Sequence, residues 1–191
     1  MSAIAIIPAR GGSVRIPRKN LRNFHGMPIM VYSIRTAQAS GLFNNIVVTT
    51  DDDEIEAVAR KYGASVFRRP TCDGTMGTQE VARQCLEGIR STHYEACVIY
   101  ATAPMLTVDD LFAGYHASSG CYAMAVGTDP LCDAGMMYWG ARSLFMGRSP
   151  LVTASTRLIP IPAERMIDIN TPEDWAKAEA MYAHWRMNHD E

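Results

Sequence analysis

Residues 3–20 read AIAIIPARGGSVRIPRKN, and this stretch decides the fold. The first five residues are continuously apolar and rich in isoleucine, and Pro8 ends the run, which is typical of a strand buried on both faces of a parallel sheet. The part that follows is polar and holds two adjacent glycines and four cations, Arg10, Arg15, Arg18 and Lys19. The stretch therefore predicts a buried strand that runs into a basic loop.

Downstream of this loop, segments with helical and strand-like patterns alternate. Helical spacing of apolar residues predicts a helix over residues 27–39, and β-branched residues predict a strand over 46–50. The same reasoning gives further strands over 64–67, 96–100 and 122–126 and further helices over 51–62, 79–89 and 109–117. This order predicts an α/β protein, a Rossmann-like α/β/α sandwich with a mainly parallel sheet and right-handed crossovers. Ligands of such sheets bind at the carboxyl ends of the strands.

The alternation ends after residue 126. Residues 127–135 are rich in turn formers, 136–139 form one more possible strand, and 144–158 follow no regular pattern. An extended segment over 159–169 leads into a last helix, for which Thr171 is the expected N-cap, Pro172 the first helical residue and Asp174 a first-turn carboxylate. The length of 191 residues fits a single domain.

The composition excludes several classes of protein. The 18 basic and 20 acidic residues give a net charge of −2, which is no footprint for a nucleic acid partner. No apolar stretch is long enough to span a membrane, and residues 1–8 are too short for a secretion signal. The five cysteines form no CxxC pair, and their odd number predicts reduced thiols in a cytoplasm; they are Cys72, Cys85, Cys97, Cys121 and Cys132. We therefore expect a cytoplasmic protein.

The basic loop suits a polyphosphate ligand. Backbone N–H groups at Gly11 and Gly12 can approach phosphate oxygens, and Arg and Lys side chains can add charge-assisted hydrogen bonds. The pattern matches neither the P-loop nor the dinucleotide fingerprint. The alternative is a solvated basic turn. The position of the loop at the end of the first strand favours a binding site.

Carboxylates follow two of the expected strands. Asp51 lies nearest the end of the second strand and is a candidate for the nucleotide site, whereas Asp52 and Asp53 are better explained as the N-cap and first turn of a helix. Asp168 stands between two isoleucines in an expected strand, just before the last helix. A lone carboxylate there suits Mg²⁺, which takes one or two carboxylates and completes its shell with phosphate oxygens and water. The alternative is a strand-end cap.

Five motifs recur in the same order in a known family. They are residues 6–13 (IIPARGGS), 15–20 (RIPRKN), 48–52 (VTTDD), 68–70 (RRP) and 168–175 (DINTPEDW). The chain thereby resembles the sugar-acid cytidylyltransferases, which activate acylneuraminate and its relatives with CTP, over nearly its whole length. Residues 100–104 (YATAP) and 133–135 (DAG), followed by Tyr138 and Trp139, are most similar to the pseudaminic acid branch, whose product feeds flagellin or capsule glycosylation.

The resemblance implies a reaction and a set of site residues. CTP and a nine-carbon 2-keto sugar acid would give the CMP-sugar and pyrophosphate, with Mg²⁺ as cofactor and a homodimer as the assembly. With the loop pattern, it gives as catalytic residues Arg10, Arg15 and Lys19; as nucleotide-binding residues Arg10, Gly11, Gly12, Ser13, Lys19, Asn20, Asp51 and Arg69; and as metal ligands Asp168 and Asn170.

The chain departs from the family pattern at three places. Val14 stands where the family has lysine, and Asn170 stands where it usually has a second aspartate. The segment that serves the family as a dimerisation arm is shortened near residues 127–135. Two alternatives therefore stay open, a catalytically impaired nucleotide-binding relative and a sugar-phosphate nucleotidyltransferase that uses another base.

Overall fold

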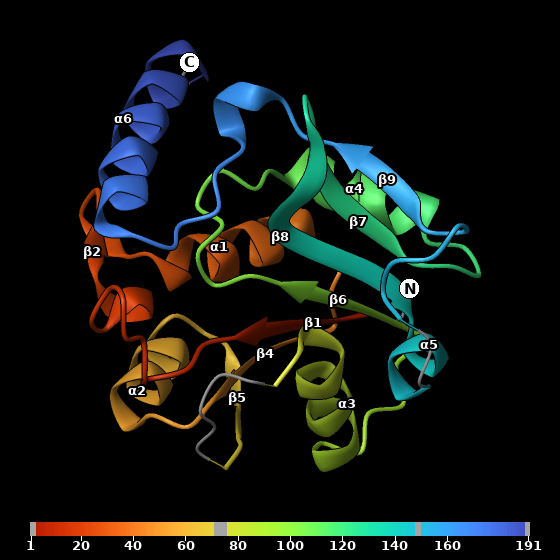
Figure 1. Cartoon of the computed structure of the whole chain (residues 1–191). Coiled ribbons are helices and arrows are strands. Elements are labelled where there is room, and N and C mark those ends of the chain that lie inside the picture. Colours follow the sequence, from red (N-terminus) through yellow and green to blue (C-terminus); the bar gives the residue numbers. More distant parts are fainter. Residues whose placement is uncertain (1–2, 71–75, 148–149, 190–191) are drawn as a thin grey trace.

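The computed structural model describes residues 3–70, 76–147 and 150–189, which form one mixed sheet covered by helices (Figure 1). The sheet has seven strands in the order β5-β4-β1-β6-β8-β7-β9. The strands are β1 (Ala3–Pro8), β4 (Asn45–Thr50), β5 (Ser65–Arg68), β6 (Glu95–Ile99), β7 (Ala123–Thr128), β8 (Leu131–Ala141) and β9 (Arg157–Pro160), and β2 (Asn23–Phe24) and β3 (Met27–Pro28) form a separate hairpin. The helices are α1 (Met30–Ser40), α2 (Asp53–Lys61), α3 (Thr78–Gly88), α4 (Val108–Ala117), α5 (Arg142–Met146) and α6 (Pro172–His189), with 3₁₀ turns η1 (Lys19–Leu21) and η2 (Ala163–Arg165).

The first half of the sheet is parallel. β1 lies between β4 and β6 and pairs in parallel with both, and β4 pairs in parallel with β5. β8 runs antiparallel to both β6 and β7, and β9 is parallel to β7. The predicted α/β sandwich with a mainly parallel sheet is confirmed, and the carboxyl ends of β1, β4 and β6 meet at one edge.

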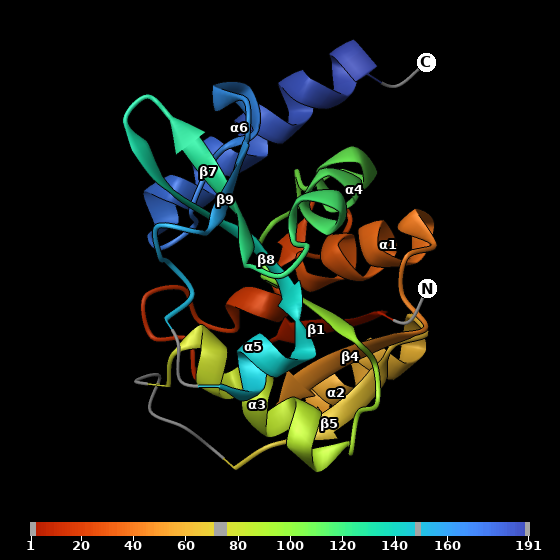
Figure 2. The same cartoon turned by 90° about the vertical axis from the view of Figure 1, so that its right-hand side faces the viewer.

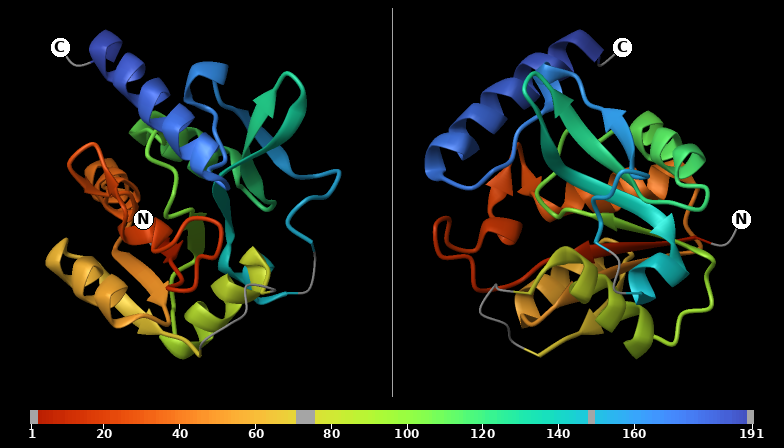
Figure 3. Two further views of the ribbon diagram at one scale, coloured as in Figure 1. Left: turned by 60° about the vertical axis from the view of Figure 1, so that its left-hand side comes forward. Right: turned by 45° about the vertical axis from the view of Figure 1, so that its right-hand side comes forward.

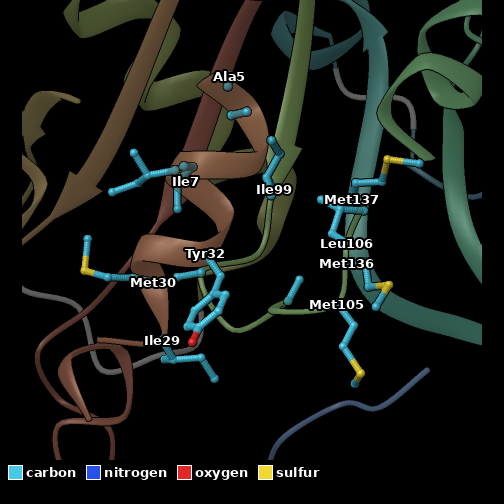
Figure 4. Close-up of a cluster of buried hydrophobic side chains, with 14 of the residues drawn as sticks. Ala5, Ile7, Ile29, Met30, Tyr32, Ile99, Met105, Leu106, Met136 and Met137 are labelled. Carbon is cyan, nitrogen blue, oxygen red and sulfur yellow. The ribbon is translucent and has the colours of Figure 1, made fainter. Parts of the chain in front are cut away.

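The core consists of two apolar layers, one on each face of the sheet. Ala5 and Ile7 of β1 face the layer that contains residues of α1, α2 and α4, whereas Ile4 and Ile6 face α3 and α5. The helices accordingly lie on opposite sides of the sheet (Figure 2). Figure 4 shows Ile7 beside Met30 of α1, within the first layer. Because β1 is buried on both faces, its sequence is an unbroken apolar run.

Three elements differ from the sequence prediction. Residues 27–28 belong to the hairpin β2–β3, so α1 begins at Met30. Strand β8 starts at Leu131 rather than at 136, because the turn-rich stretch over 127–135 is the tip of an antiparallel hairpin with β7 in which Thr128 pairs with Leu131. The stretch 144–158, for which no regular structure was predicted, contains the end of α5 (residues 144–146) and the start of β9 (residues 157–158).

The last helix begins as predicted. Thr171 Oγ1 accepts from the backbone N–H of Asp174 at 3.2 Å, and the Asp174 carboxylate accepts from the N–H of Thr171 at 2.8 Å. These reciprocal bonds satisfy two donors at the helix start. The segment before it, residues 166–170, belongs to no strand, so the expectation that Asp168 lies in a strand is wrong. No helix of the described part of the chain is long and apolar enough to cross a membrane.

Four of the five cysteines fall in the described ranges, and all four are free thiols. Cys85 and Cys97 are buried in the core, and burial raises the pKa of the Cys85 thiol to about 12. Cys72 lies outside the described residues.

Candidate active site

The loop after β1 is held in shape by its own polar groups and by the end of β4. The backbone N–H of Gly11 donates to Asp51 Oδ1 at 2.9 Å, and Asn20 Nδ2 donates to the carbonyl of Arg10 at 2.9 Å. A Cβ at Gly11 would meet the side chain of Asp52, with its Cβ only 2.9 Å away. Glycine is therefore required there, and Asp51 is a residue that fixes the loop backbone.

A pocket of about 330 Å³ opens at the carboxyl ends of β1 and β6. Seven of the predicted site residues line it: Arg10, Ser13, Arg15, Lys19, Asn20, Arg69 and Asn170. Its other walls come from β1, the loop, the start of α3 and the end of β6: Pro8, Val14, Ile16, Met76, Thr78, Val81, Tyr100, Ala101 and Thr102. Gly11, Gly12, Asp51 and Asp168 are not among the lining residues. The structure thus gathers most of the predicted residues around one cavity.

Three of the four loop cations line this pocket. Arg10 and Lys19 are half-buried and Arg15 is exposed. Arg18 is the exception, because its guanidinium binds the Asp52 carboxylate and also reaches Glu54 at 2.9 Å. Asp52 in turn caps α2 by accepting from the N–H of Ile55 at 3.0 Å, as its expected role requires. Arg18 therefore ties the loop to α2.

Lys19 lies close to two of the other loop cations, Arg15 and Arg10. Its Nζ donates to the carbonyl of Ile169 at 2.6 Å. Burial lowers the pKa of Lys19, the carboxylate of Asp168 opposes that effect, and the neighbouring charges of Arg15 and Arg10 lower it further. The cations are thus close enough to repel one another, which is the electrostatic arrangement that an anionic ligand stabilises.

The segment before α6 runs beside the loop that follows β1 (Figure 3), and its Asn170 lines the pocket. Arg15 Nη2 donates to Asn170 Oδ1 at 3.0 Å, and Asn170 Nδ2 donates to Asp168 Oδ2 at 2.5 Å. Asp168 is exposed and lies next to Gly135 of β8, where a Cβ would be 3.5 Å from its Cγ. Among residues 3–70, 76–147 and 150–189, no cluster of three or more His, Cys, Asp or Glu side chains could hold a metal ion. Asp168 offers a single carboxylate.

A polar network on the far wall was not predicted as part of the site. Tyr100 hydroxyl and Thr78 Oγ1 are 2.8 Å apart, and the rings of Tyr100 and Tyr138 have centroids 5.9 Å apart. Tyr138 donates to the Asp133 carboxylate, and burial together with this bond raises the pKa of the Tyr138 phenol well above its usual range. The position of Tyr100 directly after a buried strand is the signal that could have identified it from the sequence.

A cluster of cations at the carboxyl edge of a mainly parallel α/β sheet, beside a glycine-containing loop, is typical of enzyme domains that bind nucleotides. The loop after β1 matches neither the P-loop nor the dinucleotide fingerprint. Comparison with known proteins shows to which family of enzymes the chain belongs.

Residues 4–122 match the family model described as cytidylyltransferase, and the chain belongs to this family of nucleotidyltransferases. The chain is 29% identical to the pseudaminic acid cytidylyltransferase of Campylobacter jejuni subsp. jejuni serotype O:2, with 100% of this chain and 99% of that protein covered. It is 38% identical to N-acylneuraminate cytidylyltransferase A of Danio rerio, over 53% of this chain and 24% of that protein. The resemblance inferred from the motifs is confirmed.

The fold is shared with solved structures. A CMP:2-keto-3-deoxy-manno-octonic acid synthetase complexed with CTP superposes with a TM-score of 0.79 at 15% identity, covering 97% of this chain and 100% of that one. The alignment with the Campylobacter relative extends over 232 positions, whereas this chain has 191 residues, so the relative carries segments without a counterpart here. In this chain β7 and β8 are joined at the turn Asp129-Pro130.

Proposed function

We propose that this protein transfers CMP from CTP to a sugar acid, and that this sugar acid is pseudaminic acid, which the name of its full-length Campylobacter relative gives. The observation that carries the proposal is the pocket lined by Arg10, Arg15 and Lys19 at the end of β1, together with the full-length similarity to a pseudaminic acid cytidylyltransferase. The anomeric hydroxyl of the sugar acid attacks the α-phosphorus, a bond to the CMP phosphate forms, and the bond to pyrophosphate breaks. The task of the protein is therefore to position two anions and to stabilise the leaving group.

Different pocket residues bind the triphosphate and stabilise the leaving pyrophosphate. Arg10, Arg15 and Lys19 neutralise the triphosphate, and the cation that best stabilises a leaving pyrophosphate is one whose own solvation is already reduced. Lys19 meets this condition because it is half-buried and anchored on Ile169. Arg69, 8% exposed and also on the pocket wall, supplies a further guanidinium for the nucleotide. Ser13 lines the pocket beside these cations, and it is held there by the backbone bond from its N–H to the carbonyl of Gly11 at 3.0 Å.

Asp168 would hold a magnesium ion that accompanies CTP. Its exposed carboxylate suits a metal that keeps several water and phosphate ligands. The ion would offset negative charge on the phosphates. The side chains of the chain itself bind and orient the triphosphate.

The decisive assay is pyrophosphate release with CTP, Mg²⁺ and a panel of pseudaminic, legionaminic, N-acetylneuraminic and 3-deoxy-octulosonic acids. We expect release with pseudaminic acid above the others and a preference for CTP over ATP, GTP and UTP. Preference for another base would support a sugar-phosphate nucleotidyltransferase instead. No release and no CTP-dependent rise in melting temperature would refute both readings.

Val14 offers a direct gain-of-function test. Its side chain is 88% exposed and lines the pocket, so a lysine there would reach the triphosphate through solvent. We expect Val14→Lys combined with Asn170→Asp to raise kcat/KM about tenfold, because one cation and one metal-binding carboxylate are added. Val152→Lys is the matched control, since Val152 is 61% exposed and lies outside the pocket lining. An unchanged double variant would contradict the assignment of these positions.

A second candidate function is nucleotide binding without useful turnover. The apolar Val14 at the pocket and the neutral Asn170 beside Asp168 favour it, because each removes a charge that could act on the transferring phosphate. CTP would then raise the melting temperature while the sugar-acid panel gives no pyrophosphate. In that case the double variant should gain the missing activity.

A further inference from the structure

The partners of Asn170 fix the orientation of its side-chain amide. A guanidinium only donates hydrogen bonds and a carboxylate only accepts them. The contact with Arg15 at 3.0 Å therefore identifies the amide oxygen, and the contact with Asp168 at 2.5 Å identifies the amide nitrogen. Turning the amide by half a rotation would place NH₂ against the guanidinium and oxygen against the carboxylate, so both contacts would become repulsive.

This orientation is unsuited to a shared metal. A cation bound between Asp168 and Asn170 would need an oxygen from each side chain. Here the amide oxygen of Asn170 faces Arg15, and its NH₂ group occupies one oxygen of Asp168. The residue thus differs in role from the second ligand that the sequence pattern implies.

Asn170 is itself well anchored. Its backbone N–H donates to Asp174 Oδ2 at 2.9 Å, and the adjacent carbonyl of Ile169 accepts from Lys19 at 2.6 Å. Arg15, in contrast, is exposed and sits on a long side chain that loses several rotatable degrees of freedom when it is held. A fixed acceptor on the opposite wall keeps such a guanidinium at the pocket.

We propose that Asn170 is a positioning residue that holds the guanidinium of Arg15 at the triphosphate pocket, and that Asp168 is the metal-binding side chain of the segment 168–170. The proposal rests on the proposed function only in taking the pocket as the CTP site. Arg15 then supplies a cation to the loop in which position 14 is valine. Its guanidinium is held by the neutral side-chain amide of Asn170.

The test measures the dissociation constant of CTP by calorimetry, first with EDTA and then with Mg²⁺. The variants are Asn170→Ala, Arg15→Ala and the two combined. We expect each single change to weaken metal-free binding about three- to tenfold, because an exposed guanidinium loses its place or is removed. The combined variant should bind as Arg15→Ala does, since the two residues act as one unit. The gain from Mg²⁺ should stay the same in Asn170→Ala.

A metal-ligand role for Asn170 gives the opposite result. Asn170→Ala would then bind metal-free CTP as the unmodified chain does and would lose part of the gain from Mg²⁺, which would overturn the proposal. Arg60→Ala is the matched control, because Arg60 is ion-paired to Glu56 on α2 and does not line the pocket. Its binding should be unchanged.

A second measurement keeps the proposal separate from the proposed function. If the unmodified chain binds no CTP at all, the proposed function fails, but the link can still be observed in the side-chain amide resonances of Asn170 in a ¹⁵N-labelled sample. Asn170→Asp identifies them by their loss. Arg15→Ala should shift them, whereas Arg60→Ala should leave them in place. Unshifted resonances in Arg15→Ala would overturn the proposal.

Discussion

Replacing Lys19 by alanine should lower kcat/KM for CTP by about 10²- to 10³-fold. The Lys19 ammonium is half-buried, bonded to the carbonyl of Ile169, and in the field of Arg10, Arg15 and Asp168. In other enzymes, the loss of one preorganised group that stabilises a developing negative charge lowers kcat by about 10²- to 10³-fold. Steady-state pyrophosphate release checks it. Lys61→Ala, on α2 outside the pocket lining, is the control and should change the rate less than about twofold.

The pH profile gives an independent test of the same residue. The pKa of Lys19 is lowered from its ordinary value by burial, so the ammonium is present below that lowered pKa and is lost as pH rises through it. The rate should therefore fall on the alkaline side at a lower pH than an ordinary lysine would give. Lys19→Arg should remove this alkaline limb, because a guanidinium stays protonated. An identical limb in both proteins would assign it to another group.

The second large effect concerns stability. Arg165 donates to Asp110 at 2.5 and 3.0 Å and to the carbonyl of Met105 at 3.1 Å, and the two side chains are only 12% and 8% exposed. We expect Arg165→Met to lower the free energy of unfolding by about 3 kcal/mol, because Asp110 is left buried without its cation. Urea denaturation followed by circular dichroism measures it.

The control for this change is Arg60→Met. Arg60 pairs with Glu56 on the surface of α2, with the arginine side chain 60% exposed, and such pairs contribute less than about 1 kcal/mol. Equal losses in the two variants would show that the Arg165–Asp110 pair contributes nothing special. Asp110 also accepts from the N–H of Thr107 at the start of α4, so Asp110→Asn separates the helix cap from the ion pair.

The parts of the fold that were predicted correctly depend on local signals. β1 reads as an apolar run because both of its faces are buried, and β4 is recognised by its β-branched residues. α6 begins at its capping residues because those bonds are formed within four positions. β8 was placed too short because Leu131, Cys132 and Asp133 are exposed at the tip of a hairpin, so nothing in their polarity indicates pairing. β8 lies between β6 and β7 and runs antiparallel to both. Its pairing with β6 joins residues far apart in the sequence, so no local sequence pattern predicts it.

The candidate site, like the fold, could be predicted where local sequence signals determine it and not where distant segments meet. The loop cations could be assigned from residues 10–20 because they follow a buried strand directly, but Arg18 is indistinguishable from Arg15 in sequence and turns to Asp52 instead. The wall formed by Tyr100 and Thr78 depends on two segments meeting in space. The direction of the Asn170 amide depends on two partners. Arg15 lies 155 positions away in the sequence, and Asp168 lies two positions away.

The two bonds that join the loop to the segment before α6 connect residues 155 and 150 positions apart in the chain. During synthesis the basic loop emerges before residues 166–170, so the part of the pocket wall that Asn170 contributes forms only once this segment has docked. Any contribution of Arg15 and Lys19 that depends on this segment would be gained at that step. Bound CTP should in turn favour the docked state of the C-terminal segment and protect it from proteases, by mass action alone.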